Sequence, residues 1–419
     1  MPNKIFLLIL IIFMNGNAIN IYSQTISSTD DYVYTPDIKS VKFYASSNPL
    51  SSPISDVLGN IPLTFEFDDI SGESRSYYYK IIHCDMDWNV SKNINENDYL
   101  NGYNDIEIKN YSNSSFTLIP YIHYSMYLPN KDTRWTISGN YLLMIYDDDD
   151  EPVIIRRFMV SENTVKVFAT LDHPKDVSKY YTHQTLDIQL NTKDYYVVDP
   201  LKELKVDVLQ NDRWSDAITD ISPKYLAGYD LTFDEFDPFT FKSLNEFRNA
   251  DFRSLKYTNV DIHSIDIRRN GVNIILEKDE MRRNSNYFLW NDINGNFLNL
   301  NLDNNDINRS EYCNVTFTLK TYAAIPDQKI YVTGAFCEWQ LYDENELEYD
   351  KELDAYTGTI LLKQGVYDYY YALVDKSGKV DYSALEGSHY QTENDYTILV
   401  YQRPFGGKYD KLVGVRVVE

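Results

Sequence analysis

The chain has 419 residues, of which 43% are hydrophobic and 15% aromatic, enough to bury the cores of about two to four domains. Its formal net charge is -24, which repels polyphosphate and argues against nucleic acid as a partner. Three cysteines are too few for a disulfide framework in a chain of this length. Only Cys313 and Cys337 lie close in sequence, so a bridge between these two stays an open alternative to free thiols.

Residues 1–24 have the pattern of a cleaved export signal. Lys4 precedes the apolar run 5–13, and polar residues follow that run. The apolar run is too short to span a membrane, which takes about 20 residues. We therefore expect an exported mature protein without a membrane span.

Residues 25–160 predict a first β-sandwich. Short runs of alternating apolar and polar residues are separated by turn-forming clusters such as Asn101-Gly102, and this pattern is typical of antiparallel sheets. The 38 tyrosines favour strands as well, because a ring with a polar tip tolerates half-burial.

Residues 161–310 predict a second β unit. Asn270-Gly271, between two alternating runs, is the strongest hairpin signal in the chain. The stretch 204–255 begins as a half-buried strand and continues into a loop rich in aromatic and acidic residues. We expect other parts of the protein to bury most of the aromatic rings of this loop. These rings are Phe233, Phe236, Phe239 and Phe241.

Residues 311–419 alternate in the same way and predict a third β unit. No amphipathic helix of ordinary length is evident anywhere in the sequence. The predicted fold class is therefore all-β, with β-sandwich domains in tandem.

The sequence offers no catalytic or metal-binding motif. His83 and Cys84 suggest nucleophile chemistry, but neighbouring side chains of a strand face opposite sides, and Cys84 fits a core position better. The acidic run 147–151 lacks the spaced ligands of a cation site and fits a solvated loop. We expect no enzymatic activity, no cofactor and no metal ion.

Aromatic and basic residues are the remaining candidates for binding. Tyrosines at alternate positions of one predicted strand could stack on sugars, although core packing is the more common role of such a row. Arg and Trp side chains are enriched at binding hot spots, although pairing within the chain is the more common role of any one of them. The candidates for partner binding are Arg213, Trp214, Phe247 and Arg248, and those for carbohydrate binding are Trp339, Tyr367, Tyr369 and Tyr371.

Several segments in order resemble the plug protein family of the type IX secretion system of Bacteroidota. The resemblance runs from about residue 38 to residue 414, nearly the whole mature chain. It implies a periplasmic protein of tandem β-sandwiches, without catalytic residues, that docks on a large outer-membrane translocon barrel and blocks its pore. The matching segments include YYYKIIHCDMDW, SGNYLLMIYDDDDEPVIIRRFMV, VLQNDRWSDAI, NEFRNADFRS, YVTGAFCEW and LLKQGVYDYYYAL.

The last unit also resembles early-set, immunoglobulin-like modules that bind glycogen in polysaccharide enzymes. In those modules a Trp after a glycine-containing turn stacks on sugar, and Trp339 occupies the matching place. A carbohydrate-binding periplasmic or surface module is therefore the alternative function. Fold similarity alone does not establish sugar binding.

Overall fold

A computed structural model describes residues 29–234 and 236–419 of the chain. Strands account for 47% and helices for 6% of the chain, so the predicted all-β fold class is confirmed. The predicted export signal at 1–24 lies outside the described residues.

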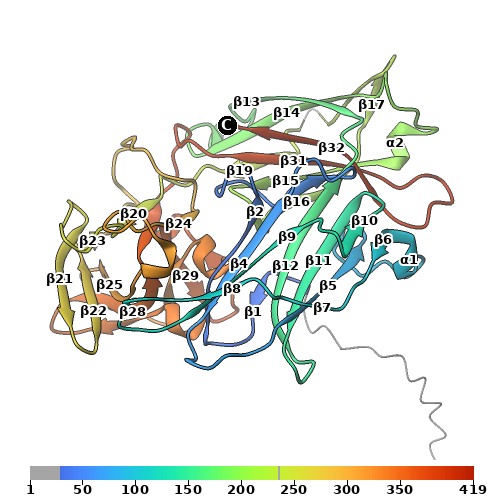
Figure 1. Cartoon of the computed structure of the whole chain (residues 1–419). Coiled ribbons are helices and arrows are strands. Elements are labelled where there is room, and N and C mark those ends of the chain that lie inside the picture. The colour runs from blue at the N-terminus through green and yellow to red at the C-terminus, as the bar shows by residue number, and fades with distance from the viewer. Residues whose placement is uncertain (1–28, 235) are drawn as a thin grey trace, which may run out of the picture.

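The N-terminal unit is a sandwich of two sheets. Its core contains Phe65 and Phe67 from one sheet and Tyr141, Leu143 and Phe158 from the other. In Figure 1 the strands of the first sheet are drawn in blue to teal, next to green strands of the second sheet. The first sheet has the order β2-β4-β9-β8, with β2 at Ile38–Ala45, β4 at Leu63–Asp69, β9 at Ile122–Leu128 and β8 at Tyr111–Asn113.

The second sheet runs on into the central unit. Strand β12 meets β32 in a parallel pair, Ser161 opposite Leu412, so N-terminal and C-terminal segments share ten strands. All eight residues of β11 are buried, because both faces of this sheet are covered. The order is β16 (Arg213–Ile221), β15 (Leu204–Gln210), β31 (Tyr396–Gln402), β32 (Lys411–Val418), β12 (Pro152–Ser161), β11 (Gly139–Tyr146), β5 (Tyr78–Cys84) and β7 (Ile106–Glu107), with β1 (Tyr32–Val33) and β3 (Ile54–Asp56) paired to β12.

The central unit closes its own core against β15 and β31. Three of the four clustered phenylalanines, Phe233, Phe239 and Phe241, are buried there, whereas Phe236 is 88% exposed. The central sandwich itself therefore buries these three rings. Its second sheet contains β13 (Lys166–Asp172), β14 (His183–Asn191), β18 (Asp230–Thr232) and β17 (Tyr225–Ala227), with β19 (Thr240–Lys242) beside β14.

The third unit is an eleven-stranded assembly, drawn in yellow and orange in Figure 1. The predicted hairpin forms at its edge, where Arg268 pairs with Gly271 and residues 269–270 make the turn. The order is β20 (Arg248–Asp251), β29 (Gly365–Asp375), β26 (Gln328–Thr333), β27 (Glu346–Asp350), β28 (Ala355–Lys363), β25 (Tyr312–Lys320), β22 (Gly271–Leu276) and β21 (Ile262–Arg268), with β23 (Asp279–Glu280), β24 (Phe297–Asn299) and β30 (Val380–Asp381) alongside.

The remaining elements are short. Strands β10 (Thr133–Trp135) and β6 (Leu100–Gly102) form a two-stranded sheet. Single helical turns occur at α1 (Glu96–Tyr99), α2 (Pro200–Glu203) and α3 (Ser383–Glu386), and as 3₁₀ turns at η1 (Val177–Lys179), η2 (Ile307–Arg309), η3 (Ala335–Cys337) and η4 (Asp343–Asn345).

The sheets group the chain differently from the boundary expected after residue 310. Strands β20 to β24, expected in the second unit, pair within the sheet assembly of the third. Strands β31 and β32, expected in the third, return to pair with β15 and β12. Sequence spacing could not reveal this, because the final hairpin crosses between units through backbone hydrogen bonds that any alternating strand can form.

Candidate functional site

The residues that the sequence suggested for binding converge on the junction between the units. Arg213 at the start of β16 has a side chain that is 0% exposed. Its guanidinium lies 5.3 Å from the ring centre of Trp339 and 5.2 Å from that of Tyr382. Its Nη2 donates to Gln210 Oε1 at 2.9 Å and to Asp216 Oδ2 at 2.7 Å. This arginine therefore joins the central unit to the third from the inside.

Arg248 is held in a buried network of opposite charges. Its Nε donates to Glu386 at 3.0 and 3.1 Å, and its Nη1 donates to Asp279 at 2.5 Å. Arg282 adds a second ion pair to Glu386 at 2.7 Å. Burial raises the pKa of Glu386, but the two guanidinium groups outweigh it and hold the carboxyl below its ordinary value. The network fixes α3 against β20 and β29.

Phe247 and Trp214 complete the set of partner-binding candidates. Phe247 is 1% exposed and stacks on Tyr370 with ring centres 3.8 Å apart. Trp214 is half-buried and meets Trp88 of the N-terminal unit edge to face at 4.9 Å. Of the four candidates, Trp214 alone is partly open to solvent.

The tyrosines suggested for sugar stacking lie inside the third unit. Tyr367, Tyr369 and Tyr371 are at most 3% exposed, because β29 runs through the middle of the sheet assembly with both faces covered. The hydroxyls of Tyr369 and Tyr371 both donate to Asp279 Oδ2, at 2.8 and 2.7 Å. Trp339 is half-buried and packs on Phe247. These rings do not form an accessible stacking platform.

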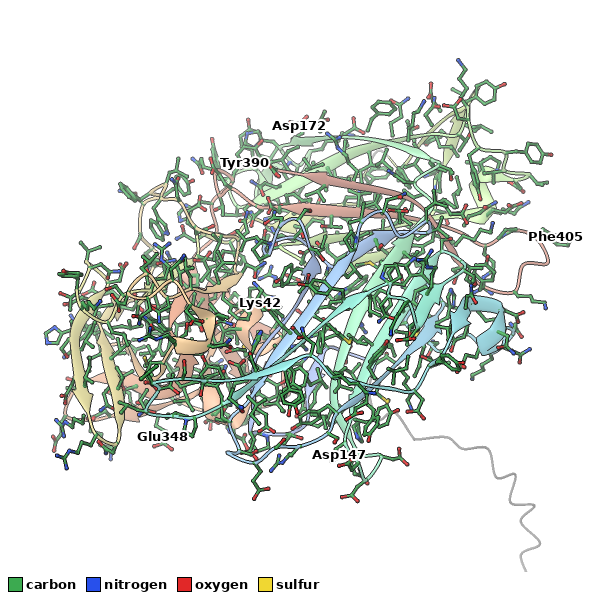
Figure 2. The ribbon with its side chains drawn as sticks, in the orientation of Figure 1. Lys42, Asp147, Asp172, Glu348, Tyr390 and Phe405 are labelled. Atoms are coloured by element: carbon green, nitrogen blue, oxygen red, sulfur yellow. The ribbon has the colours of Figure 1, made fainter. Side chains whose placement is uncertain are left out.

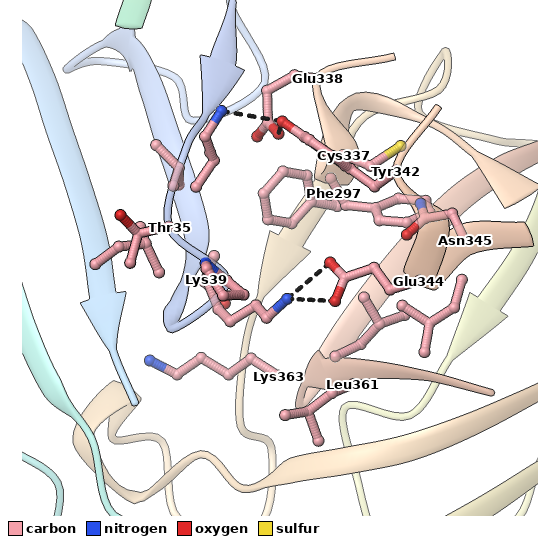
Figure 3. Close-up of a pocket in the computed structure, with 18 of the residues that line it drawn as sticks. Thr35, Lys39, Phe297, Cys337, Glu338, Tyr342, Glu344, Asn345, Leu361 and Lys363 are labelled. Carbon is pink, nitrogen blue, oxygen red and sulfur yellow. Dashed lines mark hydrogen bonds and ion pairs between the residues drawn. The ribbon is translucent and has the colours of Figure 1, made fainter. Parts of the chain in front are cut away.

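A cavity of about 330 Å³ lies between the N-terminal segment 32–41 and the third unit (Figure 3). Lys39 reaches across it, and its Nζ contacts both carboxylate oxygens of Glu344 at 2.7 Å. On the same wall Glu338 forms a buried ion pair with Arg156 and accepts from Tyr342 at 3.0 Å. The charged groups named here are thus already paired across the interface, and the rest of the lining is largely aliphatic and aromatic.

Lys42 on β2 makes a further link between units. Its Nζ donates to the Phe297 carbonyl and to Asn296 Oδ1 at 3.3 Å, and it lies 4.5 Å from the Phe297 ring centre. Burial lowers its pKa to about 8. Lys42 and Arg156 were not anticipated from the sequence, since their role depends on partners more than 180 residues away.

The groups that suggested nucleophile chemistry have structural partners. His83 Nδ1 bonds Ser91 Oγ at 2.9 Å, and burial lowers its pKa to about 4. Burial raises the pKa of Cys84 to about 12. Cys84, Cys313 and Cys337 are free thiols and all buried. Within 29–234 and 236–419, no group of three His, Cys, Asp or Glu side chains is arranged to hold a metal ion.

The family model for the first domain of the type 9 secretion system plug protein matches residues 38–162, the N-terminal sandwich. The chain belongs to this plug protein family. Its fold matches the crystal structure of a hypothetical protein from Parabacteroides merdae with a TM-score of 0.88 and 30% sequence identity. That match covers 93% of this chain and 98% of the other, so the similarity extends through all three units. No curated protein sequence matches the chain.

In the part of the chain that the structure describes, no helix has the length and apolarity of a membrane span. Several large apolar side chains in loops are exposed to solvent. The most exposed are Phe405, Phe116, Val260, Phe236 and Tyr196. Figure 2 shows Phe405 on a loop that extends away from the body of the molecule. The only sequence signal for Phe405 is the turn chemistry around it, Pro404 before it and Gly406-Gly407 after it.

Proposed function

We propose that this protein is a non-catalytic periplasmic plug of the type IX secretion system. It docks on the periplasmic side of the large outer-membrane translocon barrel and occludes the pore when no substrate passes. The observation that supports this most directly is the match of residues 38–162 to the plug family, together with a full-length fold match at 30% identity.

The packing between units supports a plug that acts as one body. A pore is blocked only if the blocking protein keeps its shape against the rim, so hinge motion between units would open a leak. Buried ion pairs oppose such motion, because separating one leaves an uncompensated charge in a low-dielectric site. Arg156 with Glu338 is such a pair between the first and third units, with side chains 7% and 5% exposed.

We propose that Arg213, Phe247 and Arg248 contribute to docking indirectly, by fixing the shape of the central junction. Their burial supports a positioning role rather than direct contact with a partner. Trp214 is the one candidate with part of its surface available to the barrel.

Affinity purification from the native outer membrane tests the proposal. The tagged full-length protein, bound to detergent-solubilised outer membranes, should retain a barrel protein of very large mass. Tagged protein unfolded before loading is the control. Retention of no large barrel protein by the folded chain would contradict docking.

Permeability tests the occlusion step separately. Cells that lack this protein but still assemble the barrel should admit large solutes that the outer membrane normally keeps out of the periplasm. Expression of the intact chain should restore the barrier. An unchanged permeability in cells with an assembled barrel would argue against a plug even if the two proteins bind.

A further inference from the structure

Strand β13 is an open sheet edge. It pairs with β14 over seven consecutive residues, without a register shift, and no other strand of the described residues pairs with it. Among the described residues, no backbone group of 166–172 bonds to a segment other than β14. Figure 1 shows β13 along the upper border of the molecule, with no segment drawn beyond it.

Other long edges of this protein are protected, whereas β13 is not. Two register shifts interrupt the pairing of β16, and one interrupts that of β21. Such irregularities twist an edge and prevent a further strand from pairing. Strand β13 has a continuous register, and its exposed residues include Phe168 at 56% and Leu171 at 38%. An uninterrupted, partly apolar edge of this kind is a template for strand addition.

The sequence of β13, KVFATLD, is complementary to itself when two copies run antiparallel. With Ala169 opposite its own copy, a lysine lies opposite an aspartate at both ends, and residues of the same face lie opposite each other. The opposed pairs are Lys166 with Asp172, Val167 with Leu171, Phe168 with Thr170, and Ala169 with Ala169 of the second copy.

We propose that β13 pairs with β13 of a second copy, forming a two-fold symmetric dimer in which the two five-stranded sheets become continuous. This goes beyond the plug function and does not depend on it. The contact is limited to one strand pair and its flanks, which places it among weak, reversible interfaces.

Sedimentation velocity of the mature full chain tests the dimer over concentrations up to about 300 µM, the range in which weak interfaces assemble. The parent protein should show a monomer–dimer equilibrium. Lys166→Glu and Asp172→Lys should each weaken dimerisation about tenfold, because each puts two like-charged pairs opposite each other. The double variant Lys166→Glu/Asp172→Lys should restore the parent affinity.

A second comparison separates β13 from other exposed aromatics. Phe168→Lys should weaken the dimer, because it removes the apolar contact of each ring with Thr170 of the second copy and sets two lysines diagonally across the strand pair, whereas Phe405→Lys should leave it intact. Both side chains are exposed, at 56% and 97%, so neither change threatens the fold. A parent protein that stays monomeric at the highest concentration overturns the proposal. A dimer that is equally stable in both single charge variants also overturns it. Whether the protein binds the outer-membrane barrel affects neither of these outcomes.

Discussion

Asp68 of β4 and Lys363 of β28 form an ion pair of 2.7 Å between the first and third units, and each side chain is only 1% exposed. Asp68 also accepts from the Tyr312 hydroxyl at 2.7 Å and bonds His123 Nδ1 at 2.8 Å. Burial raises the pKa of Asp68, but Lys363 and His123 outweigh it and hold the pKa below its ordinary value. Asp68 therefore stays ionised, and its pairing with Lys363 depends on the contact between the units.

Removal of one partner of this pair should destabilise the protein strongly. We expect Asp68→Asn to lower the free energy of unfolding by about 3–5 kcal/mol, since Lys363 would be left buried without its opposite charge. Asp327→Asn is the control, because its pair with Lys376 is 71% and 73% exposed and such pairs contribute about 0–1 kcal/mol. Urea unfolding of both variants measures the difference. Equal effects would mean that the buried pair contributes little.

Gly295 should not tolerate a side chain. It has a φ of +79°, and an added Cβ would lie 2.6 Å from a Trp339 ring atom and 2.8 Å from one of Phe247. Gly378 has a φ of +83° with nothing within 4 Å of an added Cβ, so Gly378→Ala experiences the backbone strain alone. We expect Gly295→Ala to be less stable than Gly378→Ala by about 1–3 kcal/mol. Thermal unfolding of the two variants decides this, and equal melting temperatures would show that the junction relaxes freely.

Asp207 on β15 should make stability depend on pH. Burial raises its pKa to about 7, and its Oδ2 has no hydrogen-bond partner among the described residues. In the window from about pH 4 to pH 7 the folded state keeps a proton that the unfolded state loses, so stability falls as pH rises.

Asp207→Asn removes this titration. The variant should match the parent near pH 4 and exceed it above pH 7 by up to about 4 kcal/mol, from 1.36 kcal/mol per pKa unit. Urea unfolding at pH 4, 5.5 and 7.5 gives the comparison, and a difference independent of pH would contradict the argument.

The row of tyrosines on β29 should act through packing. Tyr369 is 3% exposed, and its ring centre lies 5.0 Å from that of Phe317. We expect Tyr369→Ala to cost about 3–5 kcal/mol, as for other buried aromatic rings. Tyr181→Ala, at a ring that is 75% exposed, is the control.

A glycan affinity gel tests the alternative function. Retention of the parent protein on the gel, lost in a folded Trp339→Ala variant, would favour carbohydrate binding.

Arg248→Glu should disrupt the fold rather than a docking surface. The new carboxylate would lie with Glu386 and Asp279 in a buried site, and we expect a loss of more than about 3 kcal/mol. Arg268→Glu is a control for charge reversal, since that side chain is 68% exposed. Circular dichroism and urea unfolding measure both variants. A stable Arg248→Glu protein would show that this network is dispensable.

The sequence by itself determined the fold class. Side chains of a strand alternate between its two faces, so apolar and polar residues at alternate positions predict a sheet wherever the strand later pairs. The Asn270-Gly271 signal located a hairpin for the same local reason, and three of the four clustered phenylalanines were buried as expected. The resemblance to the plug family was likewise readable without a structure, and the family model confirms it over residues 38–162.

Only the tertiary structure decided what the charged and aromatic candidates contact. Arg213 and Arg248 have the composition of binding hot spots, yet both side chains are buried against residues that follow them in sequence by more than 100 positions. The return of β31 and β32 to the central unit was equally hidden, because backbone hydrogen bonds do not depend on side-chain identity. Alternation is a local property that a sequence displays, whereas the partner of a charge or of a strand edge is set by the arrangement of the whole chain.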